Sequence, residues 1–370
     1  MLRDEVLALL RAQKGVPLSG EAMSQKLGVS RAAVWKAMEA LRQEGYVISS
    51  APRRGYALED SPDRLSPGEL MAPGRKIGSN LVCLDTVDST NNEVKRRAVD
   101  QVPEGLVVVS AQQTGGRGRR GRSFVSPPGG LYLSALLKPD CPLEQVSALT
   151  AWSAVAVCDA VEQVCGIRPG IKWPNDVILE GRKLCGILTE LELEGETAAL
   201  RYVVAGIGVN LSQTEEDFGP EVAPVAISLA QALGQAPRRA AVASALLDAL
   251  DKLDRDFPGQ WDRWLERYRA DCITVGRPIK VLRGSTERTG TAVGVDDTFA
   301  LVVRWEDGTQ EALSSGEVSV RGLLGYVKEK RDRTFGCGPF LRFNKWSPES
   351  PRSGPHSPPR RSTGCGHPSP

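Results

Sequence analysis

The chain has 370 residues, 41% of them hydrophobic and 25% charged, and 47 Lys and Arg against 45 Asp and Glu leave a net charge of +2. This length predicts two or three domains, and the composition excludes collagen-like and wholly disordered chains. The acidic start (Asp4, Glu5) argues against a signal peptide, and the longest apolar stretch, 147–158, is shorter than the roughly 18 residues of a membrane helix, so we expect a soluble cytoplasmic protein without membrane contact.

Histidine and cysteine usage excludes several classes of site. The two histidines, His356 and His367, lie near the C-terminus, so the body of the chain has no residue for a Ser-His-Asp site or a His-ligated metal. The eight cysteines form no CxxC pair, which predicts free thiols in a reducing compartment. We therefore expect no metal site built from protein side chains.

The first 60 residues have the pattern of a winged helix-turn-helix DNA-binding domain. Apolar residues at helical spacing begin at Leu2, Ser19 and Ser30 are typical N-caps, and the helices that they begin are predicted to run to about 27 and 44. Short strands at 47–48 and 56–58, joined by a Pro-Arg-Arg-Gly turn, complete the predicted wing.

The second of these capped helices separates a core stripe from a candidate DNA surface. Val34, Ala37, Met38 and Leu41 share one face. The other face and the wing tip give the candidate DNA contacts: Ser30, Arg31, Ala32, Trp35 and Lys36 for the major groove, and Arg53 and Arg54 for phosphate. Nine basic against seven acidic residues predict weak binding by one copy, so a dimer on a palindrome is expected. Two alternatives stay open: a winged helix used only for protein contact, and a Trp35 that packs in the core.

The rest of the chain divides at changes in composition. Prolines and glycines at 61–75 predict a linker, and 76–268 reads as a catalytic domain with strands at 106–110, 131–137, 177–179, 187–193 and 203–209 and helices at 143–164 and 239–257. Short connections favour an α+β fold with a mixed sheet. Gly-rich turns at 269–326 predict a small SH3-like β-barrel. The composition of 327–370, with eight prolines and a net charge of +5 after residue 330, predicts a disordered tail to which we assign no function.

The sharpest motif is the loop at 113–122, where four arginines and four glycines follow Gln113 and Thr114. Arginine forks bind carboxylates and phosphates, and glycine lets the backbone approach a ligand. A P-loop is rejected because Pro127 and Pro128 follow where its helix must begin. An RGG-type RNA-binding patch is disfavoured because the motif occurs once and lies between strands.

Four further motifs are weak singly and stronger together. They are Asp88-Ser89-Thr90-Asn91-Asn92, Lys172-Trp173-Pro174-Asn175-Asp176, Gly181-Arg182-Lys183-Leu184 and Gly206-Ile207-Gly208-Val209-Asn210. With the arginine loop they supply cations and amides but no nucleophile. That combination favours activation of a carboxylate by ATP, which needs positioning and charge neutralisation and no covalent catalyst.

In the order and spacing of these motifs the chain resembles the family of bifunctional biotin protein ligases and biotin operon repressors, over about residues 1–325. Lipoate ligases resemble this family in fold but lack the motifs. The resemblance implies that biotin and Mg-ATP form biotinyl-5′-AMP and pyrophosphate. A lysine of the biotin carboxyl carrier protein of acetyl-CoA carboxylase, or of another biotin-dependent carboxylase, would then be biotinylated.

The resemblance also implies roles for individual residues. The implied biotin contacts are Ser89, Thr90, Asn91, Gln113, Arg117, Gly118, Arg119 and Lys183. The implied ATP and adenylate contacts are Arg119, Arg122, Phe124, Lys172, Asn175 and Asn210. The implied catalytic residues are Lys183, Arg119, Arg122 and Asp176. Phe124 stands where some relatives place a tryptophan that stacks on adenine, and Gly115 replaces a common alanine.

The winged helix adds a repressor function to these expectations. Biotinyl-AMP would be both intermediate and corepressor, ordering the arginine loop and favouring a homodimer on operator DNA. Two alternatives remain: a ligand-sensing repressor with an inactive ligase domain, and a lipoate or octanoate ligase.

Overall fold

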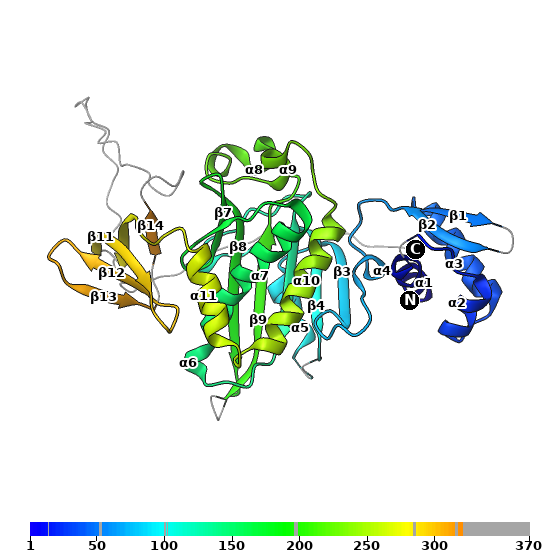
Figure 1. The fold of residues 1–370 in the computed structure, drawn as a ribbon, viewed down its shortest axis with the longest axis horizontal. Helices are drawn as coiled ribbons and strands as arrows, with labels where there is room; N and C mark the ends of the chain where they lie inside the picture. Colours follow the sequence, from blue (N-terminus) through cyan, green and yellow to red (C-terminus); the bar gives the residue numbers. More distant parts are fainter. Residues whose placement is uncertain are drawn as a thin grey trace, which may run out of the picture. The chain divides into compact units, whose positions relative to one another are not determined.

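The computed structural model describes residues 1–320, apart from 14, 52–53, 100, 102, 196–198, 284–285 and 315–316. The predicted tail at 327–370, the two histidines and Arg53 lie outside the described residues. The described chain is a mixed α/β structure with an N-terminal helix-turn-helix, a central sheet covered by helices and a small C-terminal sheet (Figure 1).

The N-terminal segment has the elements that its sequence predicts. They are α1 (Leu2–Ala12), α2 (Gly20–Leu27), α3 (Arg31–Gln43), β1 (Val47–Ala51) and β2 (Gly55–Asp60). Ser19 and Ser30 cap α2 and α3, since their hydroxyls accept hydrogen bonds from the N–H groups of Ala22 at 3.0 Å and Ala33 at 3.2 Å. β1 and β2 pair antiparallel as the wing. The predicted helix-turn-helix is therefore confirmed.

A short helix interrupts the segment that the sequence suggests is a linker. α4 (Pro67–Leu70) begins at Ser66, whose hydroxyl accepts from the Glu69 N–H at 3.3 Å, and Pro67 supplies the fixed φ of a first helical residue. Glu69 and Leu70 are buried, and α4 packs against α1. The prolines and glycines alone predict a loop here. The helix is stabilised by its burial against the rest of the protein, which the local sequence does not reveal.

The central sheet has seven strands in the order β3-β4-β5-β9-β8-β7-β6. Their bounds are β3 Asn80–Val87, β4 Leu106–Gln113, β5 Leu131–Leu137, β6 Gly170–Lys172, β7 Asp176–Leu179, β8 Arg182–Leu193 and β9 Leu200–Val209. β3 and β4 run parallel, and the other described pairs are antiparallel. The expected mixed sheet is therefore confirmed.

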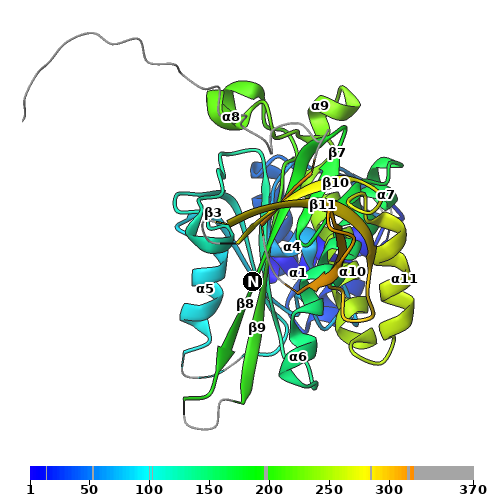
Figure 2. The same ribbon diagram turned by 90° about the vertical axis from the view of Figure 1, so that its left-hand side faces the viewer.

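Helices cover both faces of this sheet, as Figure 2 shows with α5 on one side and α7, α10 and α11 on the other. The helices of the domain are α5 Thr90–Arg97, α6 Leu143–Val146, α7 Ala148–Cys165, α8 Glu215–Val222, α9 Leu229–Leu233, α10 Arg239–Asp256 and α11 Trp261–Asp271, with a 3₁₀ turn, η1, at Arg119–Gly121. The span Leu143–Cys165 is long and apolar enough to cross a membrane, beyond the 147–158 stretch considered above, but 67% of its apolar 18-residue window is buried inside the protein. Such burial is typical of a core helix.

The C-terminal strands form a separate sheet in the order β13-β12-β11-β10-β14. Their bounds are β10 Pro278–Arg283, β11 Thr286–Val295, β12 Leu301–Trp305, β13 Gln310–Leu313 and β14 Glu317–Val320. Every described pairing is antiparallel, and β13 and β14 are the two edges. Because no described pairing joins these edges, the five-strand sheet is established here and the closed SH3-like barrel stays a prediction.

An aromatic cluster holds α7 against the C-terminal helices of the domain. Trp152 is fully buried and stacks on Trp264, with ring centroids 4.6 Å apart and 6° between the planes. Phe257 meets Trp152 edge to face at 4.8 Å. These contacts join α7, α10 and α11 into one layer.

Replacing Trp152 with alanine is expected to lower the free energy of unfolding of this domain by about 3–5 kcal/mol, because it leaves a cavity the size of an indole in a packed core. Urea denaturation followed by circular dichroism measures the change. Trp35→Ala is the matched control, since Trp35 is 54% exposed. Equal effects of the two substitutions would contradict this account of the core.

Candidate active site

A cavity of about 60 Å³, the inner pocket, lies where β4 ends, α5 begins and β8 and β9 run side by side. All eight residues that the sequence suggests for biotin line it: Ser89, Thr90, Asn91, Gln113, Arg117, Gly118, Arg119 and Lys183. Residues up to about 100 positions apart are thus brought round one cavity by the sheet order.

A chain of hydrogen bonds fixes the polar floor of the inner pocket. The Ser134 hydroxyl lies 2.6 Å from the Asn91 Oδ1 and 2.7 Å from the Thr90 Oγ1. The Gln113 Oε1 accepts from the Thr90 N–H at 2.8 Å, and its Nε2 donates to the Ser126 Oγ at 2.9 Å. The amide orientations are therefore set by partners within the protein.

Two glycines of β9 make room for side chains that shape the pocket. A Cβ on Gly206 would lie 2.1 Å from the Asn91 Oδ1, and a Cβ on Gly208 would lie 2.5 Å from the Phe124 ring. Asn91 is buried and Phe124 is half-buried. The Gly-x-Gly motif therefore serves close packing of side chains on a strand.

The arginine loop folds back on itself beside the pocket. Gly118 N–H donates to the Arg122 carbonyl at 2.8 Å, and Phe124 N–H donates to the Gly116 carbonyl at 2.9 Å. A Cβ on Gly116 would lie 2.3 Å from the Phe124 carbonyl, so glycine is required there. Arg120 has a φ of 58°, in the left-handed region, and its side chain is exposed.

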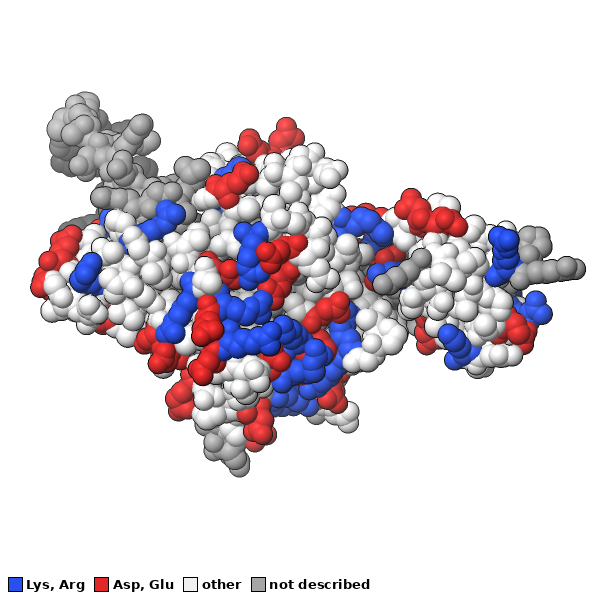
Figure 3. All heavy atoms as spheres, in the orientation of Figure 1, with Lys and Arg blue, Asp and Glu red and all other residues white. Residues whose placement is uncertain are grey.

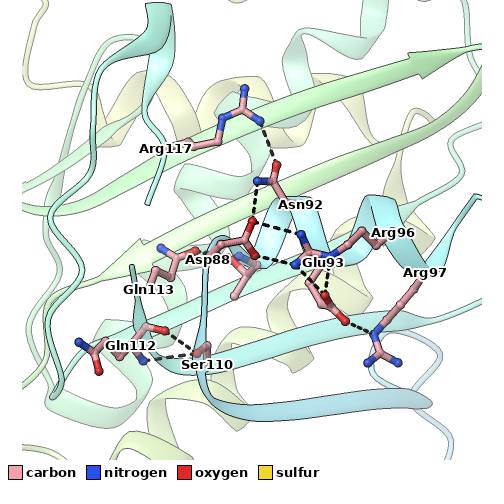
Figure 4. A network of polar contacts seen from close by, with 10 residues as sticks. Asp88, Asn92, Glu93, Arg96, Arg97, Ser110, Gln112, Gln113 and Arg117 are labelled. Carbon is pink, nitrogen blue, oxygen red and sulfur yellow. Dashed lines mark hydrogen bonds and ion pairs between the residues drawn. The ribbon is translucent and has the colours of Figure 1, made fainter. Parts of the chain in front are cut away.

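The Arg117 side chain extends from the loop and is held by a residue of α5 (Figure 4). Its Nη1 donates to the Asn92 Oδ1 at 3.0 Å, and the Asn92 Nδ2 donates to Asp88 at 3.0 Å. Arg96 binds the Asp88 carboxylate through both terminal nitrogens, and this contact and the Asn92 bond hold the pKa of Asp88 well below its usual range.

A larger cavity of about 480 Å³, the outer pocket, adjoins the first. Its lining includes all six residues that the sequence suggests for ATP: Arg119, Arg122, Phe124, Lys172, Asn175 and Asn210. Asp176, and Leu282 and Val318 of the C-terminal sheet, also contribute. The two pockets share the lining residues Gly118, Arg119, Phe124, Asn175 and Lys183, which mark the place where the cavities meet.

Lys183 is the cation at this junction. Its Nζ forms an ion pair with the Asp176 Oδ1 at 2.6 Å and lies 5.7 Å from the centre of the Phe124 ring. Its backbone is fixed on both sides, because its N–H donates to the Val225 carbonyl at 2.8 Å and its carbonyl accepts from the Asn210 Nδ2 at 3.1 Å. The Asn210 Nδ2 also donates to the Ile227 carbonyl, so this amide helps to hold the Lys183 strand.

The charge balance of the site suits an anion. Arg119 donates from Nη1 to the Asn175 Oδ1 at 3.1 Å, and Lys172 is buried. Asp176 is the one carboxylate among the described lining residues of the outer pocket. No group of three His, Cys, Asp or Glu side chains that could bind a metal ion occurs in the described ranges.

The chain is similar to known proteins along most of its described length. Residues 83–210 match the biotin/lipoate A/B protein ligase family, 3–57 match an HTH domain and 274–321 match the biotin protein ligase C-terminal domain. The bifunctional ligase/repressor BirA of Bacillus spizizenii is 35% identical over 319 residues, which are 85% of this chain and 97% of the relative. The chain belongs to the BirA family of bifunctional ligase/repressors.

Two further relatives of this BirA-family chain cover different shares of it. BirA of Escherichia coli is 29% identical over 82% of the chain and 92% of its own length. The solved structure of the biotin protein ligase from Aquifex aeolicus in complex with biotin and ATP is 30% identical, covers 66% of this chain and 99% of that one, and superposes with a TM-score of 0.56.

The helix-turn-helix of this BirA-family chain presents the residues that its sequence singles out. Ser30, Arg31, Ala32, Trp35 and Lys36 of the α3 region and Arg54 of the wing are exposed. Trp35 is 54% exposed, so the alternative that it packs in the core is wrong. Arg31 lies 3.6 Å from Glu21, and acidic and basic side chains are interspersed over the face in Figure 3.

Sequence patterns did not reveal several residues that organise the inner pocket of this BirA-family protein. Ser134 lies in an apolar strand, Asn92 belongs to the 88–92 motif but was given no role of its own, and Glu190 lies in an alternating strand segment. Burial would raise the pKa of Glu190, but hydrogen bonds from Lys95 and Asn91 and the nearby positive charges outweigh it, so that pKa lies below its usual value. Ser89 is the N-cap residue of α5, yet within the described chain its side chain makes no capping hydrogen bond.

Gly206→Ala is expected to lower the free energy of unfolding by about 1–3 kcal/mol, because its Cβ must displace the buried and hydrogen-bonded Asn91 amide. Chemical denaturation of the purified variant measures this. Gly195→Ala is the control, since a Cβ there meets no atom within 4 Å in the described chain. A Gly206→Ala protein as stable as the control would contradict this expectation, because it would show that the Asn91 amide can move aside at no cost in stability.

Proposed function

We propose that the protein is an ATP-dependent biotin protein ligase that also acts as a biotin-dependent repressor. The observation that carries this proposal is the junction of the two pockets, where Arg119 and Lys183 line both cavities. Two cations at such a junction suit a carboxylate brought against the α-phosphate of a nucleotide.

In the first proposed step the ureido ring of biotin occupies the inner pocket. Ser89, Thr90, Asn91 and Gln113 offer hydroxyl and amide groups to it, while the Arg117–Gly118 backbone closes over the ligand. The valeryl carboxylate then points to the junction. It attacks the α-phosphorus of ATP, the bond to the β-phosphate breaks, and biotinyl-5′-AMP and pyrophosphate form.

The outer pocket is proposed to hold ATP. Phe124 offers an aromatic face for adenine, while Lys172, Asn175, Arg119 and Arg122 surround the remainder of the nucleotide. Lys183 stabilises the charge that develops on the phosphate during adenylation. Mg²⁺ would supply charge neutralisation on the phosphates and is proposed to arrive with ATP. Asp176, the one carboxylate in the described lining of the outer pocket, is paired with Lys183.

In the second proposed step an amine of the carrier protein attacks the mixed anhydride. Asp176 orients the attacking lysine, the amine loses a proton, an amide forms between biotin and the lysine, and AMP leaves. The proposed acceptor is the biotin carboxyl carrier protein of acetyl-CoA carboxylase or of another biotin-dependent carboxylase. The proposed setting is the cytoplasm.

For the repressor function, we propose that DNA binding by the exposed face of α3 depends on whether the arginine loop is ordered. Biotinyl-AMP orders the loop and favours a homodimer, which presents two recognition helices to operator DNA. The single helix-turn-helix has too little positive charge for strong binding alone, so dimer formation controls occupancy.

Incubation with biotin, Mg-ATP and a carrier domain, followed by mass spectrometry of the carrier, tests the ligase. A single added biotinyl group is expected, and lipoate in place of biotin should leave the carrier unchanged because lipoate has no ureido ring. An unmodified carrier with no pyrophosphate released would overturn the proposal.

Lys183→Gln is expected to reduce pyrophosphate release by at least about 100-fold, since it removes a cation from the developing phosphate charge. Arg182→Gln is the control: Arg182 is the neighbouring residue, lies beside Glu180 and is absent from the described lining of both pockets. Equal activity of the two variants would remove Lys183 from the proposed chemistry.

Loss of two exposed α3 cations, Arg31→Ala with Lys36→Ala, is expected to weaken binding to the biotin operon promoter by at least about tenfold and leave carrier biotinylation unchanged. A gel shift with biotin and ATP present measures this, and the wild-type shift should vanish without biotin. Lys252→Ala, on α10, is the control. A shift unaffected by the double substitution would exclude α3 as the DNA surface.

A further inference from the structure

The motif at 172–176 forms a wall of the outer pocket and also contacts the C-terminal domain, residues 274–321. Trp173 is only 2% exposed, and both of its N–H groups find acceptors in that domain. Its backbone N–H donates to the Thr274 Oγ1 at 2.9 Å, and its indole Nε1 donates to the Phe299 carbonyl at 2.9 Å. Two separate segments of the C-terminal domain therefore hold this one residue.

The two acceptors are themselves fixed to the C-terminal sheet. Thr274 is fully buried, and two residues later the Gly276 N–H donates to the Ala292 carbonyl of β11 at 2.8 Å. Phe299 lies between β11 and β12 with a φ of 63°, and its N–H donates to the Asp296 carbonyl at 3.1 Å. The positions of the acceptors therefore follow the position of the sheet.

The main chain on either side of Trp173 has similar contacts. Before it, the Ile171 carbonyl accepts from the Ile273 N–H at 2.9 Å. After it, the Pro174 carbonyl accepts from the hydroxyl of Tyr268, a fully buried residue of α11, at 3.3 Å. The chain from 171 to 174 is therefore held along its length by residues that follow the central sheet in sequence.

The polar side chains of the same motif line the outer pocket: Lys172, Asn175 and Asp176. Asn175 also contacts β8, since its carbonyl accepts from the Ile187 N–H at 3.1 Å and its Nδ2 donates to the Ile187 carbonyl at 2.8 Å. Because Trp173 lies between Lys172 and Asn175 in the chain, a displacement of Trp173 displaces both of these pocket residues. Small displacements of groups that bind a reactant lower activity strongly.

We propose that Trp173 is a positioning residue through which the C-terminal domain sets the nucleotide-binding wall of the outer pocket. Its two N–H groups transmit the positions of Thr274 and Phe299 to Lys172 and Asn175. The identity of the nucleotide as ATP rests on the proposed function, whereas the link between the C-terminal domain and the motif does not. The polar floor of the inner pocket belongs to other elements, so biotin binding is expected to be independent of the link.

Thr274→Val is the first test variant, because it removes the acceptor of the Trp173 backbone N–H with little change in side-chain shape. Thr274 is absent from the described lining of both pockets, so the substitution removes no ligand contact there. Thr289→Val is the control: it is the same change in the same domain, at a hydroxyl that donates to the Glu306 Oε1 at 2.6 Å.

Trp173→Phe is the second variant, because it keeps an aromatic ring and removes the indole donor. Trp305→Phe is its control. Trp305 is also buried in the C-terminal domain, but its indole donates to the Glu311 Oε2 at 3.1 Å, within the C-terminal sheet.

The link is tested first without ligand, by hydrogen–deuterium exchange at the Ile187 amide, which the Asn175 carbonyl accepts. Thr274→Val and Trp173→Phe are expected to speed this exchange at least about threefold, whereas the two controls leave it unchanged. If one variant does not fold, the other carries the measurement. Unchanged exchange at Ile187 in a folded variant overturns the proposal.

The second measurement asks whether the effect reaches the nucleotide. Thr274→Val is expected to raise the KM for ATP in pyrophosphate release by at least about fivefold and to leave the Kd for biotin in calorimetry within about twofold. An unaltered KM for ATP, or an equal rise of both constants as in a general structural lesion, would contradict the positioning role. If wild-type protein releases no pyrophosphate, the proposed function fails while exchange at Ile187 still decides the link.

Discussion

The ion pair between Lys183 and Asp176 is the contact on which the site depends. It exists because β7 and β8 form a hairpin that brings two residues of different motifs within 2.6 Å. The pair places a cation where the pockets meet and matches it with a carboxylate of the neighbouring strand. Strand β9, the antiparallel neighbour of β8, places Gly206 and Gly208 beside the same junction. The mixed topology is thus the means by which distant motifs share one cavity.

Close packing of glycine against polar side chains is the second constraint. Gly206 accepts Asn91 and Gly208 accepts Phe124 on one strand face, so the pocket floor is built from side chains whose own partners are fixed. The Asn91 amide lies between Ser134 and Glu190, and Gln113 lies between Thr90 and Ser126. Groups arranged in this way need little reorganisation when a polar ligand enters. If the proposed ligand occupies the pocket, selectivity for its hydrogen-bonding ring follows from the cost of leaving such groups unpaired.

Sequence reasoning reached many of the elements and the motif residues because their signals are local, but it did not predict β3, β6, α8, α9 or α11. Ser19 and Ser30 mark helix starts, and the apolar runs mark strands whose observed bounds extend only a few residues further. Glu190 gave no such signal, since its importance comes from three partners on α5 and the arginine loop that only the folded sheet brings together. α4 was missed because its stability comes from burial of Leu70. The closure of the C-terminal barrel and the roles of the site residues stay predictions.

The electrostatics of the helix-turn-helix suit regulation better than constitutive binding. The domain holds nine basic and seven acidic residues, and Arg31 shares its charge with Glu21 at 3.6 Å. Exposed ion pairs of this kind contribute about 1 kcal/mol or less to stability, so they break readily when a DNA phosphate approaches. The paired acidic residue nevertheless reduces the long-range attraction between the domain and DNA. Affinity then depends on how many copies bind together. If dimer formation follows ordering of the arginine loop, a domain this weakly charged binds its operator only when ligand has closed the pocket, which is the behaviour that a sensor requires.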